Sequence, residues 1–178
     1  MSVVVNSKRT STVTFRIDEE LLNKLRFESK NQEISTNTLV NQVFRRFLEW
    51  DVYQPKIGLV SISKPVFVKI FEGLTEEEVI GLARTIGKDE ARDVTFFMKG
   101  KVDIDSFMAW FEIQMVNSSV QTSHTIENNI HTYIMKHDLG RNWSLYHKTI
   151  LEIIFQNVFN KRVELRCGTG TITLRFAQ

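Results

Sequence analysis

Residues 12–17 read Thr-Val-Thr-Phe-Arg-Ile, a strict alternation of polar and apolar side chains. This alternation predicts a β-strand with one apolar face, formed by Val13, Phe15 and Ile17. No second strand pattern occurs in the first fifty residues, yet the backbone N–H and C=O groups of a strand need a partner strand. The simplest partner is the same segment of a second copy. We therefore expect a two-stranded antiparallel ribbon across a twofold axis.

Two helices are predicted after this strand. Asp18 stands at an N-cap position and two glutamates follow it, so the first helix should run to about Lys30. Ser35 or Thr36 can cap a second helix, whose apolar residues repeat at spacings of three and four and which should end near Trp50.

This order of elements resembles the ribbon-helix-helix family of DNA-binding repressors. The resemblance covers roughly residues 10–50 and rests on the strand, on Asp18-Glu-Glu-Leu-Leu and on Ile34-Ser-Thr-Asn-Thr-Leu-Val40. The family commonly has a glycine before the Ile-Ser pair, where this sequence has Glu33. We therefore expect Asn31 or Gln32 to make the turn in a left-handed conformation.

The resemblance implies that the ribbon enters the major groove of double-stranded DNA. Its base-reading side chains would be Thr12, Thr14 and Arg16. Arg16 can make a bidentate contact with guanine, and threonine offers a hydroxyl and a methyl group to base edges. An ordinary solvated strand face would carry the same residues, so that alternative stays open.

The resemblance also implies a phosphate clamp at the start of the second helix. Ser35, Thr36 and Asn37 place backbone N–H groups and short polar side chains there, where the helix dipole favours an anion. Ordinary helix capping would use the same residues and is compatible with this role. Lys8 and Arg9 are predicted to form a basic arm that adds nonspecific phosphate contacts.

Charge and composition set the broad class. Residues 1–17 carry three basic and no acidic side chains, whereas residues 57–178 carry 14 of each sign, so the basic bias lies at the N-terminus. The single cysteine, Cys167, cannot form an internal disulfide, which favours a reducing compartment. No apolar run approaches 18 residues. We expect a cytoplasmic, nucleoid-associated protein that does not enter a membrane.

Proline in Gln54-Pro55-Lys56 should block the second helix and mark a domain junction. We therefore expect a ribbon-helix-helix DNA-binding domain with a basic arm in residues 1–53. Residues 57–178 should form a C-terminal α+β domain that senses an effector or oligomerises. Its pattern is several helices followed by β-β-α-β-β, which gives an antiparallel sheet and an α+β fold class for the whole chain.

Several starts and stops are predicted in the C-terminal domain. Helices should begin after Ser63, at the capping box Thr75-Glu-Glu-Glu78, and at Asp103 or Asp105. The helix that starts at the capping box should end at Gly87. Residues 94–98 fit either a short strand or a helix. A long helix should open at Asn142.

Two hairpins are predicted around this last helix. Asn128-Asn129 can adopt the positive φ angles of a tight turn between residues 120–127 and 130–137. In the second hairpin, residues 162–167 and 171–176 flank Gly168-Thr-Gly170. A loop made by Gly168 and Thr169 would place Leu165 opposite Ile172 and Val163 opposite Leu174.

The first hairpin carries three of the four histidines. Its register places His124 opposite Tyr133 and Ile126 opposite His131, so His124, His131 and His137 would share one face of the sheet. Such a face could hold Ni, Cu or Zn, and metal-sensing regulators exist among proteins of the resembled family. No compact Cys/His ligand motif is present, so ordinary histidines are the preferred interpretation. No metal or cofactor is predicted.

These patterns predict a homodimeric, sequence-specific DNA-binding transcriptional regulator, of the repressor type by resemblance. Its partners would be double-stranded DNA, a second copy or a larger homo-oligomer, and an unidentified small-molecule effector. The alternatives are the DNA-binding antitoxin of a toxin–antitoxin pair and a metal-responsive regulator. An enzyme is not expected, because no nucleophile elbow, phosphate loop or dinucleotide fingerprint occurs.

Overall fold

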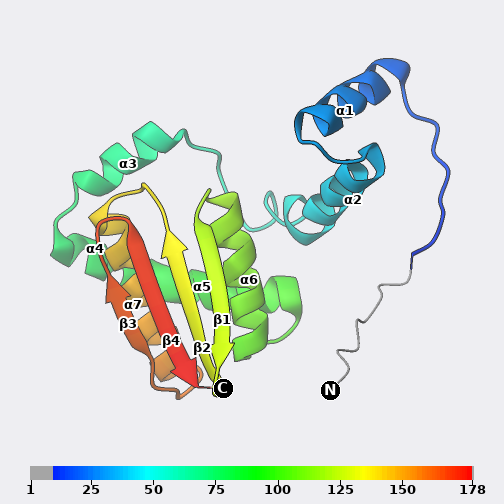
Figure 1. Cartoon of the computed structure of the whole chain (residues 1–178). Helices are drawn as coiled ribbons and strands as arrows, with labels where there is room; N and C mark the ends of the chain where they lie inside the picture. Colours follow the sequence, from blue (N-terminus) through cyan, green and yellow to red (C-terminus); the bar gives the residue numbers. More distant parts are fainter. Residues whose placement is uncertain (1–9, 178) are drawn as a thin grey trace. The chain divides into compact units, whose positions relative to one another are not determined.

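The computed structural model describes residues 10–177 (Figure 1). Within them the chain divides into two compact units, unit 1 up to Leu48 and unit 2 from Glu49 onward. None of the helices in this part combines the length and the apolar character that a membrane span needs. Together the units contain helices and one antiparallel sheet, so the α+β class is confirmed.

Unit 1 contains the two predicted helices, α1 (Glu19–Asn31) and α2 (Thr36–Arg46). A π-helical turn, η1 (Phe47–Asp51), follows α2, so helical structure ends close to the predicted residue. The carboxylate of Asp18 accepts a hydrogen bond from the backbone N–H of Leu21 at 3.1 Å. The hydroxyl of Ser35 accepts one from the N–H of Thr38 at 3.0 Å. Both N-caps are therefore as predicted.

The residues before α1 form no regular element in the single chain. Residues 10–18 belong to no helix and no strand. A strand at residues 12–17 requires a partner, and unit 1 of one chain supplies none among its described residues. The ribbon therefore stays a prediction about two copies.

The prediction for the turn between α1 and α2 was wrong. Gln32 has φ −87° and Asn31 ends α1, whereas Glu33 takes the left-handed conformation with φ 55°. The N–H of Ile34 donates to the carbonyl of Ser29 at 3.0 Å, the long closing bond of a helix C-terminus. That bond requires left-handed backbone at Glu33, the position before the Ile-Ser pair, and a residue with a Cβ adopts it at a cost of about 1 kcal/mol.

Unit 2 begins with a helical part. Its elements are α3 (Lys64–Glu72), α4 (Glu76–Leu82), the π-helical turn η2 (Ala83–Gly87), α5 (Lys88–Lys99) and α6 (Ile104–Asn117). The starts after Ser63 and at Asp103 are confirmed, as is the capping box, in which Thr75 and Glu78 exchange side-chain-to-backbone hydrogen bonds. Residues 94–98 are helical.

Gly87 does not end a helix, contrary to the prediction. The chain continues from α4 through η2 into α5 without a loop. A Cβ built on Gly87 would lie 2.5 Å from Cδ1 of Ile150 and 2.7 Å from the hydroxyl of Tyr146. Glycine is therefore needed here because another helix packs against the backbone, not because the helix stops.

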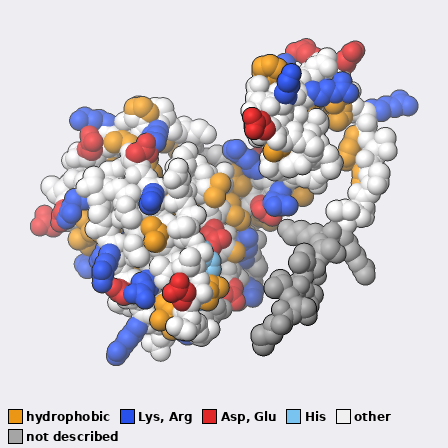
Figure 2. Space-filling view, in the orientation of Figure 1, with side chains coloured by type: hydrophobic (Ala, Val, Ile, Leu, Met, Phe, Trp, Pro, Cys, Tyr) orange, Lys and Arg blue, Asp and Glu red, His pale blue; other side chains and the backbone are white. Residues whose placement is uncertain are grey.

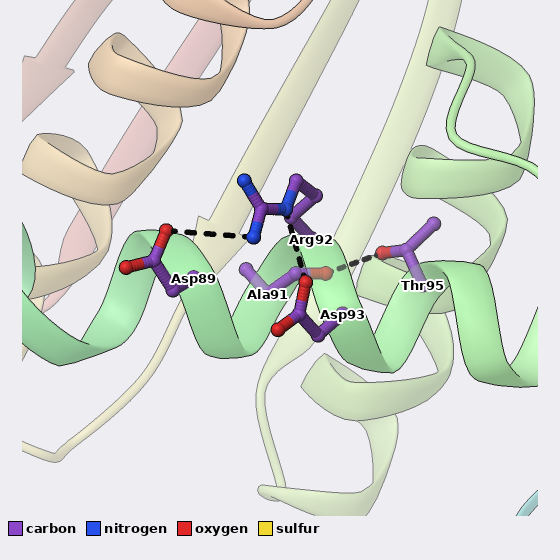
Figure 3. Close-up of polar contacts among 5 residues, drawn as sticks. All are labelled: Asp89, Ala91, Arg92, Asp93 and Thr95. Carbon is purple, nitrogen blue, oxygen red and sulfur yellow. Dashed lines mark hydrogen bonds and ion pairs between the residues drawn. The ribbon is translucent and has the colours of Figure 1, made fainter.

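Helix α5 shows how one helix separates its charged and buried sides (Figure 3). Arg92 donates to Asp93 at 2.9 Å and lies 3.8 Å from Asp89, all on the exposed side. Thr95 is fully buried, and its hydroxyl donates to the carbonyl of Ala91 at 2.6 Å. The buried hydroxyl is therefore satisfied within the helix itself.

The rest of unit 2 forms a four-stranded antiparallel sheet. Its elements are β1 (Gln121–Glu127), β2 (Ile130–Lys136), α7 (Arg141–Asn157), β3 (Glu164–Cys167) and β4 (Thr171–Ala177), and the strands lie in the order β1-β2-β4-β3. Helix α7 lies along one face (Figure 1), where it contacts β3 and β4, and α6 contacts β1. The buried core lies between this face and the helices, and the other face is open.

The first hairpin has the predicted register. His124 pairs with Tyr133 and Ile126 with His131. The turn residues Asn128 and Asn129 have φ angles of 49° and 64°. Asparagine tolerates such angles, so the turn prediction from this dipeptide is confirmed.

The predicted register of the second hairpin was wrong by two residues. Leu165 pairs with Leu174, not with Ile172, so the loop is Thr169-Gly170. The N–H of His137 donates to the carbonyl of Gly170 at 3.0 Å, and a Cβ on Gly170 would lie 2.7 Å from the His137 carbonyl. Gly170 is therefore fixed by its contact with the end of β2, and the apolar residues keep the predicted face.

Helix α7 begins at Arg141, one residue before the predicted Asn142. The side-chain N–H₂ group of Asn142 donates to the carbonyls of Phe71 and Leu74, at 2.7 and 2.8 Å. Phe71 lies in the last turn of α3 and Leu74 follows the helix; the Phe71 carbonyl also accepts from the backbone N–H of Leu74 at 3.2 Å. Asn142 thus joins two helices distant in sequence.

Candidate nucleic-acid interface

The predicted reading segment is fully accessible. Thr12, Thr14 and Arg16 are all exposed, and so are the alternating apolar residues of the same segment. Exposure alone therefore does not distinguish its two faces. The ring of Phe15 lies 5.8 Å from that of Phe44 on α2, edge to face, so this one apolar side chain of the segment contacts a helix.

Unit 1 exposes most of its large apolar side chains. Among its described large apolar residues only Leu39 is buried, at 7% exposure. Figure 2 shows apolar side chains at the surface of this unit. We call the exposed set the apolar surface of unit 1; its members are Val13, Phe15, Ile17, Leu21, Phe27, Val43, Phe44, Phe47 and Leu48, with exposures from 40% to 68%.

The start of α2 presents the predicted clamp residues in two different ways. Ser35 and Asn37 are exposed, whereas Thr36 is half-buried. The hydroxyl of Thr36 lies 3.1 Å from that of Ser29, itself buried at 4% exposure. The side chain of Thr36 therefore connects α2 to α1. If Thr36 helps to bind an anion, it would do so through its backbone N–H. Lys8 and Arg9 lie outside the described residues.

Charge does not gather by sign on the visible face of the molecule. Basic and acidic side chains are interspersed there (Figure 2). Exposed pairs such as Lys24 with Glu20, at 2.6 Å on α1, neutralise each other locally. An interface with DNA in unit 1 would therefore depend on placed groups such as Arg16, not on a large basic field.

The histidine face predicted in unit 2 is only partly assembled. Nε2 of His124 lies 3.1 Å from Nδ1 of His131. His137 lies beyond the end of β2 and is engaged elsewhere, with Nε2 2.8 Å from the Ser144 hydroxyl and Nδ1 accepting from the Leu139 N–H. Among residues 10–177 no three His, Cys, Asp or Glu side chains converge as metal ligands.

Helix α6 adds residues to the histidine pair that sequence reasoning did not include. Asp105, Met108 and Glu112 line a cleft of about 230 Å³ together with both histidines. No signal in the sequence marked them, because their position depends on how α6 docks on the sheet. The hydroxyl of Tyr133 donates a hydrogen bond to the Glu112 carboxylate in this cleft. Burial, and then the charge and hydrogen bond of Glu112, raise the pKa of Tyr133.

The sequence matches no protein-family model and no curated protein at a significant level.

Proposed function

We propose that the chain is a homodimeric, sequence-specific DNA-binding transcriptional regulator. In this proposal unit 1 of two copies forms a ribbon-helix-helix module, and residues 12–17 of each copy pair and enter the major groove. Unit 2 would respond to an effector or join dimers into larger assemblies.

The observation that carries the proposal is the apolar surface of unit 1. A unit of about 50 residues buries a smaller fraction of its surface than a larger domain does, so it has little apolar burial to spare. Unit 1 in a single chain buries one large apolar side chain among its described residues. Exposed apolar groups of this extent mark an interaction surface. A second copy is the occupant that also supplies the missing strand partner, so one association satisfies both needs.

Chemistry at the opposite side of the segment supports DNA as the ligand. Phe15 lies against Phe44 of α2, and in the proposed strand Thr14 and Arg16 would alternate to the opposite face. Their hydroxyl, methyl and guanidinium groups match the donor, acceptor and methyl pattern of base pairs in the major groove. The start of α2 adds backbone N–H groups suited to phosphate.

Unit 2 favours a regulator over the antitoxin alternative. An antitoxin tail that binds a toxin is typically short and ordered only on binding. Unit 2 instead has its own core of buried residues between helices and a four-stranded sheet. A domain of this kind is suited to ligand response or assembly.

The experiment is selection of duplexes from a random-sequence pool by the full-length protein. We expect enrichment of one motif with two inverted half-sites, since a twofold dimer reads a pseudo-palindromic site. Enrichment of no motif, or of a single half-site bound by a folded monomer, would overturn the proposal.

A further inference from the structure

The cleft between α6 and the first hairpin brings together side chains from four elements. His124 comes from β1, His131 and Tyr133 from β2 and Phe176 from β4, while α6 supplies Glu112. The cleft has a volume of about 230 Å³, enough for an ion and several waters. It is separate from every residue of the candidate nucleic-acid interface.

Packing restricts the orientation of the two histidines. The ring of His124 stacks on that of Tyr133, with centroids 3.9 Å apart and planes 8° apart. The ring of His131 stacks on Phe176 at 5.1 Å and 17°. Each imidazole is thus supported by an aromatic ring on a neighbouring strand. This arrangement directs Nε2 of His124 and Nδ1 of His131 toward each other.

The spacing of these nitrogens suits a shared metal ion. Imidazole nitrogens bind zinc at about 2.0–2.1 Å, so two of them on one ion lie roughly 2.9–3.4 Å apart for bond angles from square to tetrahedral. The observed separation of Nε2 and Nδ1 is 3.1 Å. The two nitrogens now point toward each other, so each ring must turn by roughly 40° to aim its lone pair at a shared ion beside the line that joins them. His124 is exposed, so an ion has access.

Electrostatics in the cleft also favour a cation. The Glu112 carboxylate lies on the facing helix and lines the same cleft. Neutral imidazole nitrogen prefers borderline metals over Mg²⁺ and Ca²⁺, which select oxygen ligands.

We propose that His124 and His131 bind one divalent transition-metal ion of the borderline class, Cu²⁺, Ni²⁺ or Zn²⁺, with water in the remaining positions. Water is required because no three candidate ligand side chains converge in residues 10–177. The ion is therefore exchangeable, unlike a closed four-ligand structural site. Tyr133 would hold the His124 ring in place by stacking on it, and the negative charge of Glu112 would attract the ion.

The test uses the full-length protein, freed of metals, and Cu²⁺ as the probe, since Cu²⁺ binds nitrogen ligands most strongly in the divalent series. Calorimetry should give one Cu²⁺ per chain, and pulsed electron paramagnetic resonance should show coupling to two imidazole nitrogens. His124→Ala and His131→Ala should each weaken binding by at least about tenfold. His137→Asn is the matched control, because it removes a histidine of the same region and should leave binding unchanged.

Circular dichroism of each variant checks folding, and the resonance spectrum of the unaltered protein decides the matter if a variant is unstable. The proposal is overturned if the protein binds no Cu²⁺ at micromolar concentration. It is equally overturned if the spectrum shows fewer than two imidazole ligands, or if both alanine variants bind as the unaltered protein does.

Discussion

The pH dependence of unit 2 stability depends on His147. This side chain is 7% exposed on α7, and its ring lies 3.9 Å from that of Trp143. Nδ1 donates to the backbone carbonyl of Trp143 at 3.2 Å. Burial lowers the pKa of His147 to about 4, with the charge of His137 adding to this and the backbone hydrogen bond opposing it.

The sign of the effect follows from proton binding. Between about pH 6.5 and pH 4 the unfolded chain binds a proton at His147 and the native state does not, so stability falls as pH falls. The slope is at most about 1.4 kcal/mol per pH unit. From pH 7 to pH 5 the loss amounts to roughly 2 kcal/mol, and it reaches roughly 3 kcal/mol by pH 4.

Urea unfolding followed by tryptophan fluorescence measures this loss. All three tryptophans lie in unit 2, at Trp50, Trp110 and Trp143, so the signal reports that unit alone. His147→Gln removes the titrating group and retains a polar side chain. The free energy of unfolding of the unaltered protein should fall by roughly 2 kcal/mol more than that of the variant between pH 7 and pH 5. An equal fall in both proteins would refute the assignment of this pH dependence to His147.

Two further changes test unit 2 and unit 1 separately. Asn142→Ala removes two hydrogen bonds to carbonyls at the end of α3, of which the Phe71 carbonyl keeps one from the Leu74 N–H, so the free energy of unfolding should fall by about 1–3 kcal/mol. The neighbouring Arg141→Ala loses only an exposed ion pair worth less than about 1 kcal/mol. Phe15→Ser removes a large side chain from the apolar surface of unit 1, whereas Thr14→Ala leaves that surface intact. Sedimentation should therefore show a weaker dimer for Phe15→Ser than for Thr14→Ala. Equal dimerisation of the two variants would contradict an apolar core shared between two copies.

Local rules predicted those parts of the fold that depend on neighbouring residues. The capping box at Thr75, the N-caps at Asp18 and Ser35 and the turn at Asn128-Asn129 each depend on a few adjacent residues, and each is confirmed. Backbone hydrogen bonding and φ preferences act within such short segments. They are therefore readable from sequence alone.

Two of the errors came from tertiary contacts. The residues around Gly87 would look the same if the glycine ended a helix or if it made room for Ile150. In the structure the helix continues, and Ile150 packs against Gly87. In the last hairpin a shift of two residues keeps every side chain on its face, so the apolar pattern could not choose between registers. The contact of Gly170 with the backbone of His137 fixes the observed register.

The candidate sites divide in the same way. The pairing of His124 and His131 followed from hairpin register and could be predicted, whereas Glu112 joined them only through the docking of α6. In unit 1, the pattern predicted which residues are apolar. It could not show that a single chain leaves them exposed, which is a property of packing in three dimensions.

The affinity of Arg16→Ala for DNA tests the central claim most directly. Fluorescence anisotropy would measure binding to the selected operator and to a random duplex at one stated salt concentration, with Arg26→Ala as a control that removes the same charge from α1. Arg16→Ala should lose about 1–3 kcal/mol on the operator and less on the random duplex, because a bidentate guanine contact supplies discrimination of that order. Arg26→Ala should weaken both duplexes alike or not at all. A folded Arg16→Ala protein that keeps full discrimination between the two duplexes would contradict the assignment of residues 12–17 as the reader of sequence.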